Sequence, residues 1–282
     1  MRSSQHTHQN RHRGFTLVEL IMVIVIMGVI GGVVAVFMRS PIDAYFDSAR
    51  RAALTDVADT AVRRMARDLR KALPNSIRVT TVAPSAVPNC LEFIPTRTGG
   101  RYRKADMVAA DGKALDFTQA DGQFNMLGLD AALPADQRIQ VNDVVAIYNL
   151  GITGASAYDA DNTAVINNVA LDPGGTETTL TIAPKKFPLE SGSNRFHVIP
   201  NEERVVAYVC VDNALHRTVT TGSFVSSCPA TGPVLATNVQ SCSFNYSGSD
   251  LQRNGLVQID LRISSNNETI SLYHEVHVNN SP

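Results

Sequence analysis

The stretch that decides the fold lies near the start of the chain, where residues 11–38 read RHRGFTLVELIMVIVIMGVIGGVVAVFM. From Phe15 to Met38 the only charged side chain is that of Glu19. A helix rises about 1.5 Å per residue, so this run would extend about 36 Å, enough to cross a hydrocarbon core of about 30 Å. The sequence therefore predicts one membrane-spanning helix over residues 15–38.

A short basic segment precedes the apolar run. Residues 1–14 contain Arg2, Arg11 and Arg13 and no acidic residue, which gives this segment a charge of +3. Basic flanks stay on the cytoplasmic side of a membrane, so the chain after Arg39 is expected outside the cytoplasm.

Two ordinary explanations of such an N-terminus are a cleavable secretory signal and an uncleaved anchor. A secretory signal has an apolar core of about 7–15 residues followed by a small-residue cleavage site, whereas this apolar run is longer and Gly14 precedes it. An uncleaved anchor leaves Glu19 unexplained, because an ionisable residue in a membrane segment is costly and usually marks a function. A structural alternative is that the Glu19 carboxylate snorkels to the nearby interface.

The residues around Gly14 resemble a known processing signal. The class III signal of type IV prepilins and pseudopilins is similar to the run Arg13-Gly14-Phe15-Thr16-Leu17-Val18-Glu19-Leu20. The resemblance implies that a prepilin peptidase cuts between Gly14 and Phe15 and methylates the new amine of Phe15. It also implies partners: other major and minor pilins, which pack through the N-terminal helix, together with inner-membrane lipid and an assembly platform.

Cleavage at this point would give Glu19 a defined partner. The cut keeps the apolar segment as an anchor and leaves an ammonium group on Phe15. The Glu19 carboxylate can then pair with the Phe15 amine of a neighbouring subunit, which offsets a desolvation cost of several kcal/mol in a low-dielectric filament core. Glu19 is therefore predicted to set the register of assembly and not to catalyse a reaction.

Beyond the apolar run, a second helical half is expected. Pro41 is predicted to interrupt the helix, and helical spacing resumes from Ile42 to Leu73, before Pro74. Asp59–Arg63 and Arg64–Asp68 are expected to form ion pairs one turn apart. Apolar residues three and four positions apart predict an amphipathic helix that packs on a domain, namely Leu54, Val57, Ala58, Ala61, Val62, Met65, Leu69 and Leu73.

Basic side chains gather at the end of this helix. They are Arg63, Arg64, Arg67, Arg70 and Lys71. A phosphate or DNA site is one interpretation, but a solvated face or a subunit interface is favoured. The net charge of -1 over the whole chain gives no electrostatic footprint for nucleic acid.

From Pro74 onward, short β-type runs alternate with turn residues. Strands are predicted at Ile77–Val82, Cys90–Ile94, Val144–Tyr148, Thr178–Ile182, Arg204–Val211, Ala214–Val219, Cys242–Tyr246, Leu256–Ser264 and Thr269–Val278. Asp212-Asn213 and Asn266-Asn267 are predicted to form hairpin turns, because both residue types tolerate left-handed backbone. Residues 99–142 and 149–175 are expected to form long loops.

The pattern predicts an α+β, pilin-like fold in three parts. These are a cleaved leader (1–14), a long helix (15–73) whose first half (15–38) lies in the membrane, and a large antiparallel β-rich head (74–282). The expected location is the inner membrane, crossed once, with the head in the periplasm until the subunit enters a cell-surface pilus.

Looser motifs narrow the resemblance to minor pilins of the MshO type, from the mannose-sensitive haemagglutinin (MSHA) pilus. The similar segments are Ala49–Ala52, Arg63–Arg70, Leu73–Ser76, Asn89–Phe93 and His274–Val278. The alternative is a J-type minor pseudopilin of type II secretion, which shares the helix style and a large β-rich head.

All four cysteines lie in the head, where an oxidising compartment favours two disulfides. Four cysteines allow three connectivities. Cys210–Cys228 and Cys90–Cys242 are expected, because the first would close a loop across one hairpin and the second would tie early strands to late ones. Neither a C-x2-C spacing nor a matching histidine spacing supports a zinc site.

The sequence favours a structural protein over an enzyme. The sequence contains no G-x-S-x-G, H-E-x-x-H, Walker or dinucleotide-binding motif, so neither an enzyme nor a cofactor is predicted. No metal is predicted either, since His274 and His277 would lie on opposite faces of a strand and the run from Tyr158 to Asn162 lacks the Gly and Glu of a calcium loop. A glycan-binding adhesin and an anchored periplasmic enzyme remain the alternatives from other classes.

Overall fold

A computed structural model describes residues 14–104, 113–225, 228–229, 231–247, 254–266 and 268–282. The chain divides into two units, Met1–Ala52 and Ala53–Pro282. The helix α1 (Leu17–Leu69) runs through the boundary between them.

Helix α1 has two halves of different character. In the first unit its apolar side chains are exposed, whereas in the second unit a stripe of residues is buried: Leu54, Ala58, Ala61, Val62, Met65, Ala66 and Leu69. This stripe confirms the amphipathic second half, because its spacing follows the helical repeat.

The predicted interruption at Pro41 was wrong, because α1 continues through that residue. A proline removes one intrahelical hydrogen bond, here to the carbonyl of Phe37, and the bonds on either side can keep the helix continuous. The helix ends at Leu69, and Leu73 then donates its backbone N–H to the carbonyl of Ile94 at 2.7 Å.

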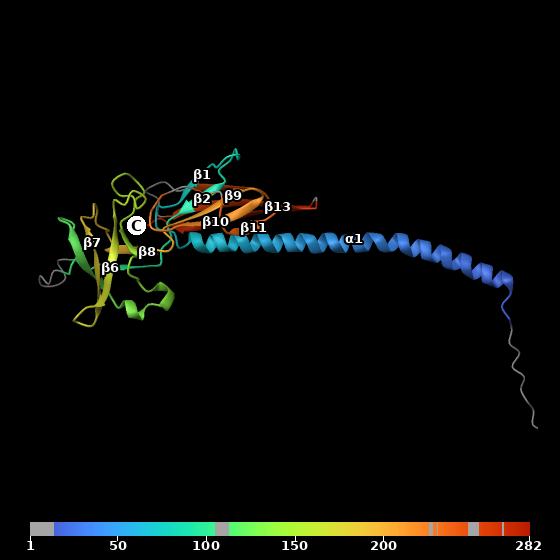
Figure 1. Cartoon of the computed structure of the whole chain (residues 1–282), viewed down its shortest axis with the longest axis horizontal. Helices are drawn as coiled ribbons and strands as arrows, with labels where there is room; N and C mark the ends of the chain where they lie inside the picture. Colours follow the sequence, from blue (N-terminus) through green and yellow to red (C-terminus); the bar gives the residue numbers. More distant parts are fainter. Residues whose placement is uncertain (1–13, 105–112, 226–227, 230, 248–253, 267) are drawn as a thin grey trace, which may run out of the picture. The chain divides into compact units, whose positions relative to one another are not determined.

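Two antiparallel sheets pack on the buried stripe of α1. The larger has the order β1(Arg78–Thr80)-β2(Cys90–Phe93)-β9(Val205–Val211)-β10(Ala214–Thr220)-β11(Val234–Thr237), and the smaller has the order β12(Val239–Ser247)-β13(Asn254–Ser265)-β14(Glu268–Asn279). Figure 1 shows β10, β11 and β13 beside the C-terminal part of α1. One apolar core joins all three layers, with Met65 from the helix, Tyr208 from β9 and Ile259 from β13 among its members.

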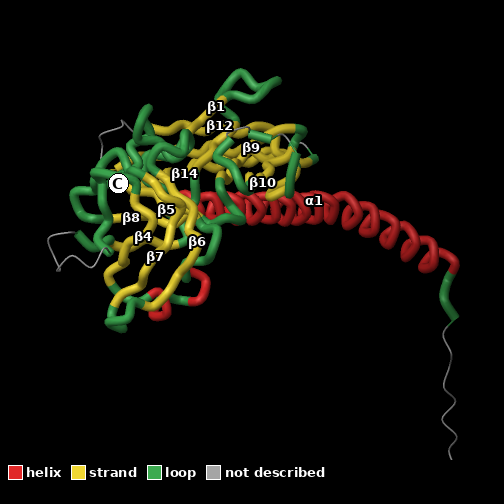
Figure 2. The backbone as a smooth tube through the Cα atoms, turned by 60° about the vertical axis from the view of Figure 1, so that its left-hand side comes forward, coloured by secondary structure: helices red, strands yellow, loops and turns green. Residues whose placement is uncertain are grey.

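A third, six-stranded sheet forms the rest of the head. Its order is β3(Thr98–Arg101)-β8(Arg195–Ile199)-β5(Val144–Ile147)-β6(Thr163–Leu171)-β7(Glu177–Lys185)-β4(Asp121–Leu127), and all its pairs are antiparallel. An isolated bridge between Tyr102 and Met126 links its two edges, so the sheet curls towards closure around a core that includes Phe124, Phe196 and Leu180. Figure 2 shows β4 to β8 gathered in this sheet. Two short 3-10 helices, Asp130–Ala132 and Ala135–Gln137, lie between β4 and β5.

A small apolar cluster connects the six-stranded sheet to the rest of the head. Its members include Ile94, which follows β2, Val144 from β5, Ile199 from β8 and Val205 from β9. The chain passes from one sheet to the other at these points, after β2 and again after β8.

The structure confirms the long helix followed by an antiparallel β-rich head, and a strand lies at each of the nine predicted positions. The predicted loops at 99–142 and 149–175 were wrong, because β3, β4 and β6 lie within or overlap them. The turn at Asp212-Asn213 is confirmed, with φ of 50° and 58°. Asn266 has a φ of 49°, while residue 267 lies outside the described residues.

Candidate functional site

The predicted processing site lies directly before α1. Gly14 and Thr16 precede the helix, and the side chain of Phe15 between them is 78% exposed. Thr16 Oγ1 accepts the backbone N–H of Glu19 at 3.3 Å, and the Thr16 carbonyl accepts the N–H of Leu20 at 3.1 Å. Thr16 is therefore the N-cap of α1.

This cap gives Glu19 a second role that the sequence analysis missed. A Thr followed three residues later by Glu is the capping-box spacing, so the run Thr16-x-x-Glu19 was a readable signal. An acidic side chain in the first helical turn also interacts favourably with the helix dipole. The Glu19 carboxylate is exposed in the single chain.

The apolar surface after Glu19 is uncovered within the first unit. Every large apolar side chain from Phe15 to Met38 is at least 45% exposed. By length and composition, α1 contains a segment apolar enough to cross a membrane. Exposed apolar surface of this extent indicates a lipid or protein environment that covers it.

Comparison with known proteins bears on this N-terminal segment. Residues 9–35 match the family model described as the prokaryotic N-terminal methylation motif. This match supports a type IV pilin-like protein. The match contains Gly14, Phe15 and Glu19. Neither a curated protein nor a solved structure matches the chain.

The disulfides of the head differ from the expected pairs. Cys90 pairs with Cys228, and Cys210 pairs with Cys242. The predicted Cys210–Cys228 and Cys90–Cys242 bonds were therefore wrong.

The two faces of the five-stranded sheet explain the observed pairing. Successive side chains of a strand point to opposite faces. Leu91 and Tyr208 lie in the core against α1, whereas Cys90 packs with Ala207 and Val209 on the other face, where the segment after β10 brings Cys228. Cys210 lies on the Tyr208 face and meets Cys242 of β12 there.

The basic side chains at the end of α1 are all exposed, as expected for a solvated face or an interface: Arg63, Arg64, Arg67, Arg70 and Lys71. The Asp59–Arg63 ion pair is confirmed. The expected Arg64–Asp68 pair is wrong, because Asp68 turns towards the sheet and accepts bonds from Tyr208 Oη at 2.7 Å and Arg217 Nε at 3.0 Å.

A polar cavity of about 420 Å³ lies near this end of the helix. Its lining includes Asp68, Arg97 and Arg217. Arg97 pairs with Asp143 at 2.9 Å, and Arg217 pairs with both Asp68 and Glu203 at 3.0 Å. These cations are thus neutralised by their own carboxylates, which favours a structural role for them.

Among the residues that the structure describes, no group of three or more His, Cys, Asp or Glu side chains is able to hold a metal ion. His274 and His277 lie on β14, where their spacing puts them on opposite faces. Asp161, from the run that resembles part of a calcium loop, instead accepts the backbone N–H of Gly154 at 2.8 Å.

Proposed function

We propose that this pilin-like protein is a non-enzymatic minor pilin, made as a prepilin and trimmed between Gly14 and Phe15 by a prepilin peptidase that then methylates Phe15. The observation that carries the proposal is the methylation motif at residues 9–35, which contains Gly14 and Phe15 and continues into the exposed apolar run 15–38, where Glu19 is the one acidic residue. Retained after cleavage, the segment 15–38 anchors the subunit in the inner membrane, with the head in the periplasm.

Assembly would occur through α1, which carries the exposed apolar surface. In the filament this surface meets the helices of other pilins in place of lipid. The Glu19 carboxylate then pairs with the Phe15 amine of a neighbour, because an unpaired charge in that environment costs several kcal/mol. A subunit in the wrong register would lose this pair.

The size of the head supports a position at the tip or at initiation. Three sheets follow α1 in the second unit. Many heads of this size packed side by side along a shaft would crowd one another, whereas a cap or a priming subunit needs room only once per filament.

Within this class we favour a minor pilin of the MSHA type. Two of the segments that resemble MshO-type pilins are strands of the head: Asn89–Phe93 contains β2, and His274–Val278 lies in β14. The alternative is a J-type minor pseudopilin of type II secretion. The long helix and the large β-rich head fit that class equally well.

Deletion of the gene in the host separates the two systems. A minor pilin predicts few or no surface pili, counted by electron microscopy, with normal secretion of exoproteins into the medium. The pseudopilin alternative predicts the reverse. Normal pili together with normal secretion would overturn the assembly role itself.

A further inference from the structure

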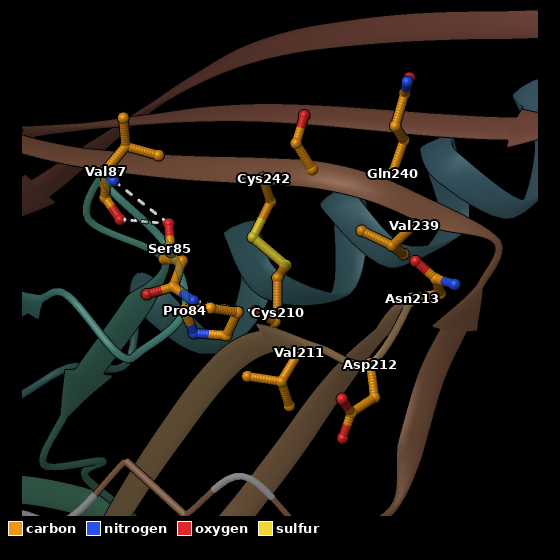
Figure 3. Close-up of a pocket in the computed structure, with 12 residues that line it drawn as sticks. Pro84, Ser85, Val87, Cys210, Val211, Asp212, Asn213, Val239, Gln240 and Cys242 are labelled. Carbon is orange, nitrogen blue, oxygen red and sulfur yellow. Dashed lines mark hydrogen bonds between the residues drawn. A yellow bond between two sulfur atoms is a disulfide. The ribbon is translucent and has the colours of Figure 1, made fainter.

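One disulfide of the head lies in an open cavity. This cavity, of about 240 Å³, is lined by the loop of Pro84, Ser85 and Val87, by the turn of Asp212 and Asn213, and by β12 from Val239 to Cys242. Figure 3 shows the Cys210–Cys242 bond between the loop and the turn. Both cysteines contribute to the lining.

The size and composition of the cavity limit what can enter it. Pockets for drug-sized ligands are about 300–1,000 Å³, so this one suits a group the size of a side chain. The lining has one ionisable side chain, that of Asp212, and no aromatic residue. Neither a strong anion site nor a sugar platform is present among these residues, and the disulfide is their most reactive group.

The other disulfide has different surroundings. Cys90 is fully buried and Cys228 is 8% exposed, and both pack against Ala207 and Val209. Cys210, in contrast, is half-buried, although its partner Cys242 is only 5% exposed. An incoming thiol can therefore reach Cys210 more readily than it can reach the buried pair.

Thiol–disulfide exchange requires a thiolate to reach one of the two sulfurs. We propose that Cys210–Cys242 is an exchange site for a dithiol oxidoreductase, which opens this disulfide through the cavity while Cys90–Cys228 stays closed. A thiolate of the dithiol attacks Cys210 Sγ, forms a mixed disulfide and releases Cys242 as a thiolate, which takes up a proton. The second thiol of the dithiol then attacks the oxidoreductase sulfur that is bonded to Cys210 Sγ. This closes a disulfide within the oxidoreductase and releases Cys210 as a thiol. The dithiol is oxidised by two electrons and the protein disulfide is reduced by two.

The opened state keeps most of the head intact. The disulfide joins β9 of the five-stranded sheet to β12 of the three-stranded sheet. Two backbone bonds hold β12 on either side of it, from Val239 N–H to the Asn213 carbonyl and from Phe244 N–H to the Pro88 carbonyl, both at 2.9 Å. Reduction thus frees one link between the sheets without removing the shared apolar core.

The test follows each cysteine separately. Full-length protein in detergent is exposed to dithiothreitol without denaturant, alkylated at timed intervals and digested, and the label on each cysteine is measured by mass spectrometry. Cys210 and Cys242 should become labelled about tenfold faster than Cys90 and Cys228, and the difference should vanish in denaturant. Equal rates under native conditions, or faster labelling of Cys90 and Cys228, would overturn the proposal.

Two matched variants test the route of access. Val87→Trp fills the cavity from its loop, and Val141→Trp makes the same change at another exposed valine; the native side chains are 47% and 53% exposed, so neither replacement disturbs the core. Labelling of Cys210 should slow in Val87→Trp and stay unchanged in Val141→Trp. An unchanged rate in Val87→Trp would contradict access through this cavity.

The attacked sulfur can be identified directly. A dithiol oxidoreductase whose second cysteine is replaced by alanine forms a mixed disulfide that it cannot resolve. The cross-link should map to Cys210. A cross-link at Cys90 or Cys228 would contradict the assignment.

Discussion

At the scale of single residues, Glu19 belongs to two arrangements that one substitution separates. It lies three residues after the capping Thr16, and its carboxylate is proposed to pair with the Phe15 amine of a neighbour. Glutamine keeps the capping-box spacing but removes the charge. Glu19→Gln should therefore leave cleavage at Gly14 largely intact yet abolish pili, as Glu19→Ala should, when processing is followed by immunoblot and pili are counted.

Thr16→Ala serves as the converse control. It removes the cap, at a cost of about 1 kcal/mol in helix stability, and keeps the charge of Glu19. Pili should persist in this variant. If Glu19→Gln assembled normally while Thr16→Ala did not, Glu19 would act through the helix end and not through charge pairing.

His197 of β8 makes the stability of the head depend on pH. Burial, followed by the positive charge of Arg195, lowers the pKa of His197 to about 4, and its Nε2 atom is buried without a hydrogen-bond partner among the described residues. The unfolded chain binds this proton near pH 6.5, so the contribution of His197 is complete above that pH and declines as the pH falls towards 4.

The free energy of unfolding should fall by about 2 kcal/mol between pH 7.5 and pH 5. Urea unfolding of full-length protein in detergent measures it. The variant His197→Gln should lack this part of the pH dependence. An identical pH dependence in both proteins would show that His197 is not buried in its neutral form.

At the scale of elements, Asp68 fastens the end of α1 to the five-stranded sheet. It accepts bonds from Tyr208 and from Arg217, and Arg217 also pairs with Glu203. The Asp68 and Arg217 side chains are 23% and 15% exposed. Removing one member of such a group leaves the charged and polar groups of its partners largely buried without a matching ion or hydrogen bond.

Asp68→Ala should therefore lower the free energy of unfolding by about 2–3 kcal/mol. Asp59→Ala is the matched control, since Asp59 pairs with Arg63 on an exposed face of the same helix, where such pairs contribute about 0.5 kcal/mol or less. Equal effects of the two substitutions in urea unfolding would contradict the fastening role of Asp68.

The elements differ in how far the sequence predicts them. The buried stripe of α1 was readable because its period is local. Two strands were readable as well, namely β9, which is rich in valine, and β13, in which apolar and polar residues alternate. β3 was not, because its sequence Thr98-Gly99-Gly100-Arg101 has low strand propensity. Gly100 is explained only by the packed sheet, where an added Cβ would lie 2.8 Å from the ring of Phe196.

The processing site could be predicted from the sequence, whereas the disulfide pairing could not. Gly14, Phe15 and Glu19 are read from one continuous motif. The cysteine pairing depends on which face of the sheet each side chain takes, and β9 gives no local signal, because apolar residues occupy both of its faces from Val205 to Val209.

At the scale of the whole molecule, the two disulfides constrain very different lengths of chain. Their sequence separations are 138 residues for Cys90–Cys228 and 32 residues for Cys210–Cys242. In the chain-entropy model a longer closed loop gives more stabilisation, about 5 kcal/mol for the first bond and about 4 kcal/mol for the second.

Double alanine variants of each pair should therefore both lose stability in urea unfolding, and the loss should be larger without Cys90–Cys228. A smaller loss for that pair would show that the reduced chain keeps structure that already brings Cys90 and Cys228 together.

If the chain is a prepilin, the mature protein has a defined N-terminus that can be measured. The measurement is N-terminal sequencing and intact mass of the membrane-fraction protein, from the host with and without its prepilin peptidase. The mature chain should begin at N-methylated Phe15 only when the peptidase is present. A chain that begins at Met1 in both strains, or one cut after Met38, would contradict the prepilin proposal.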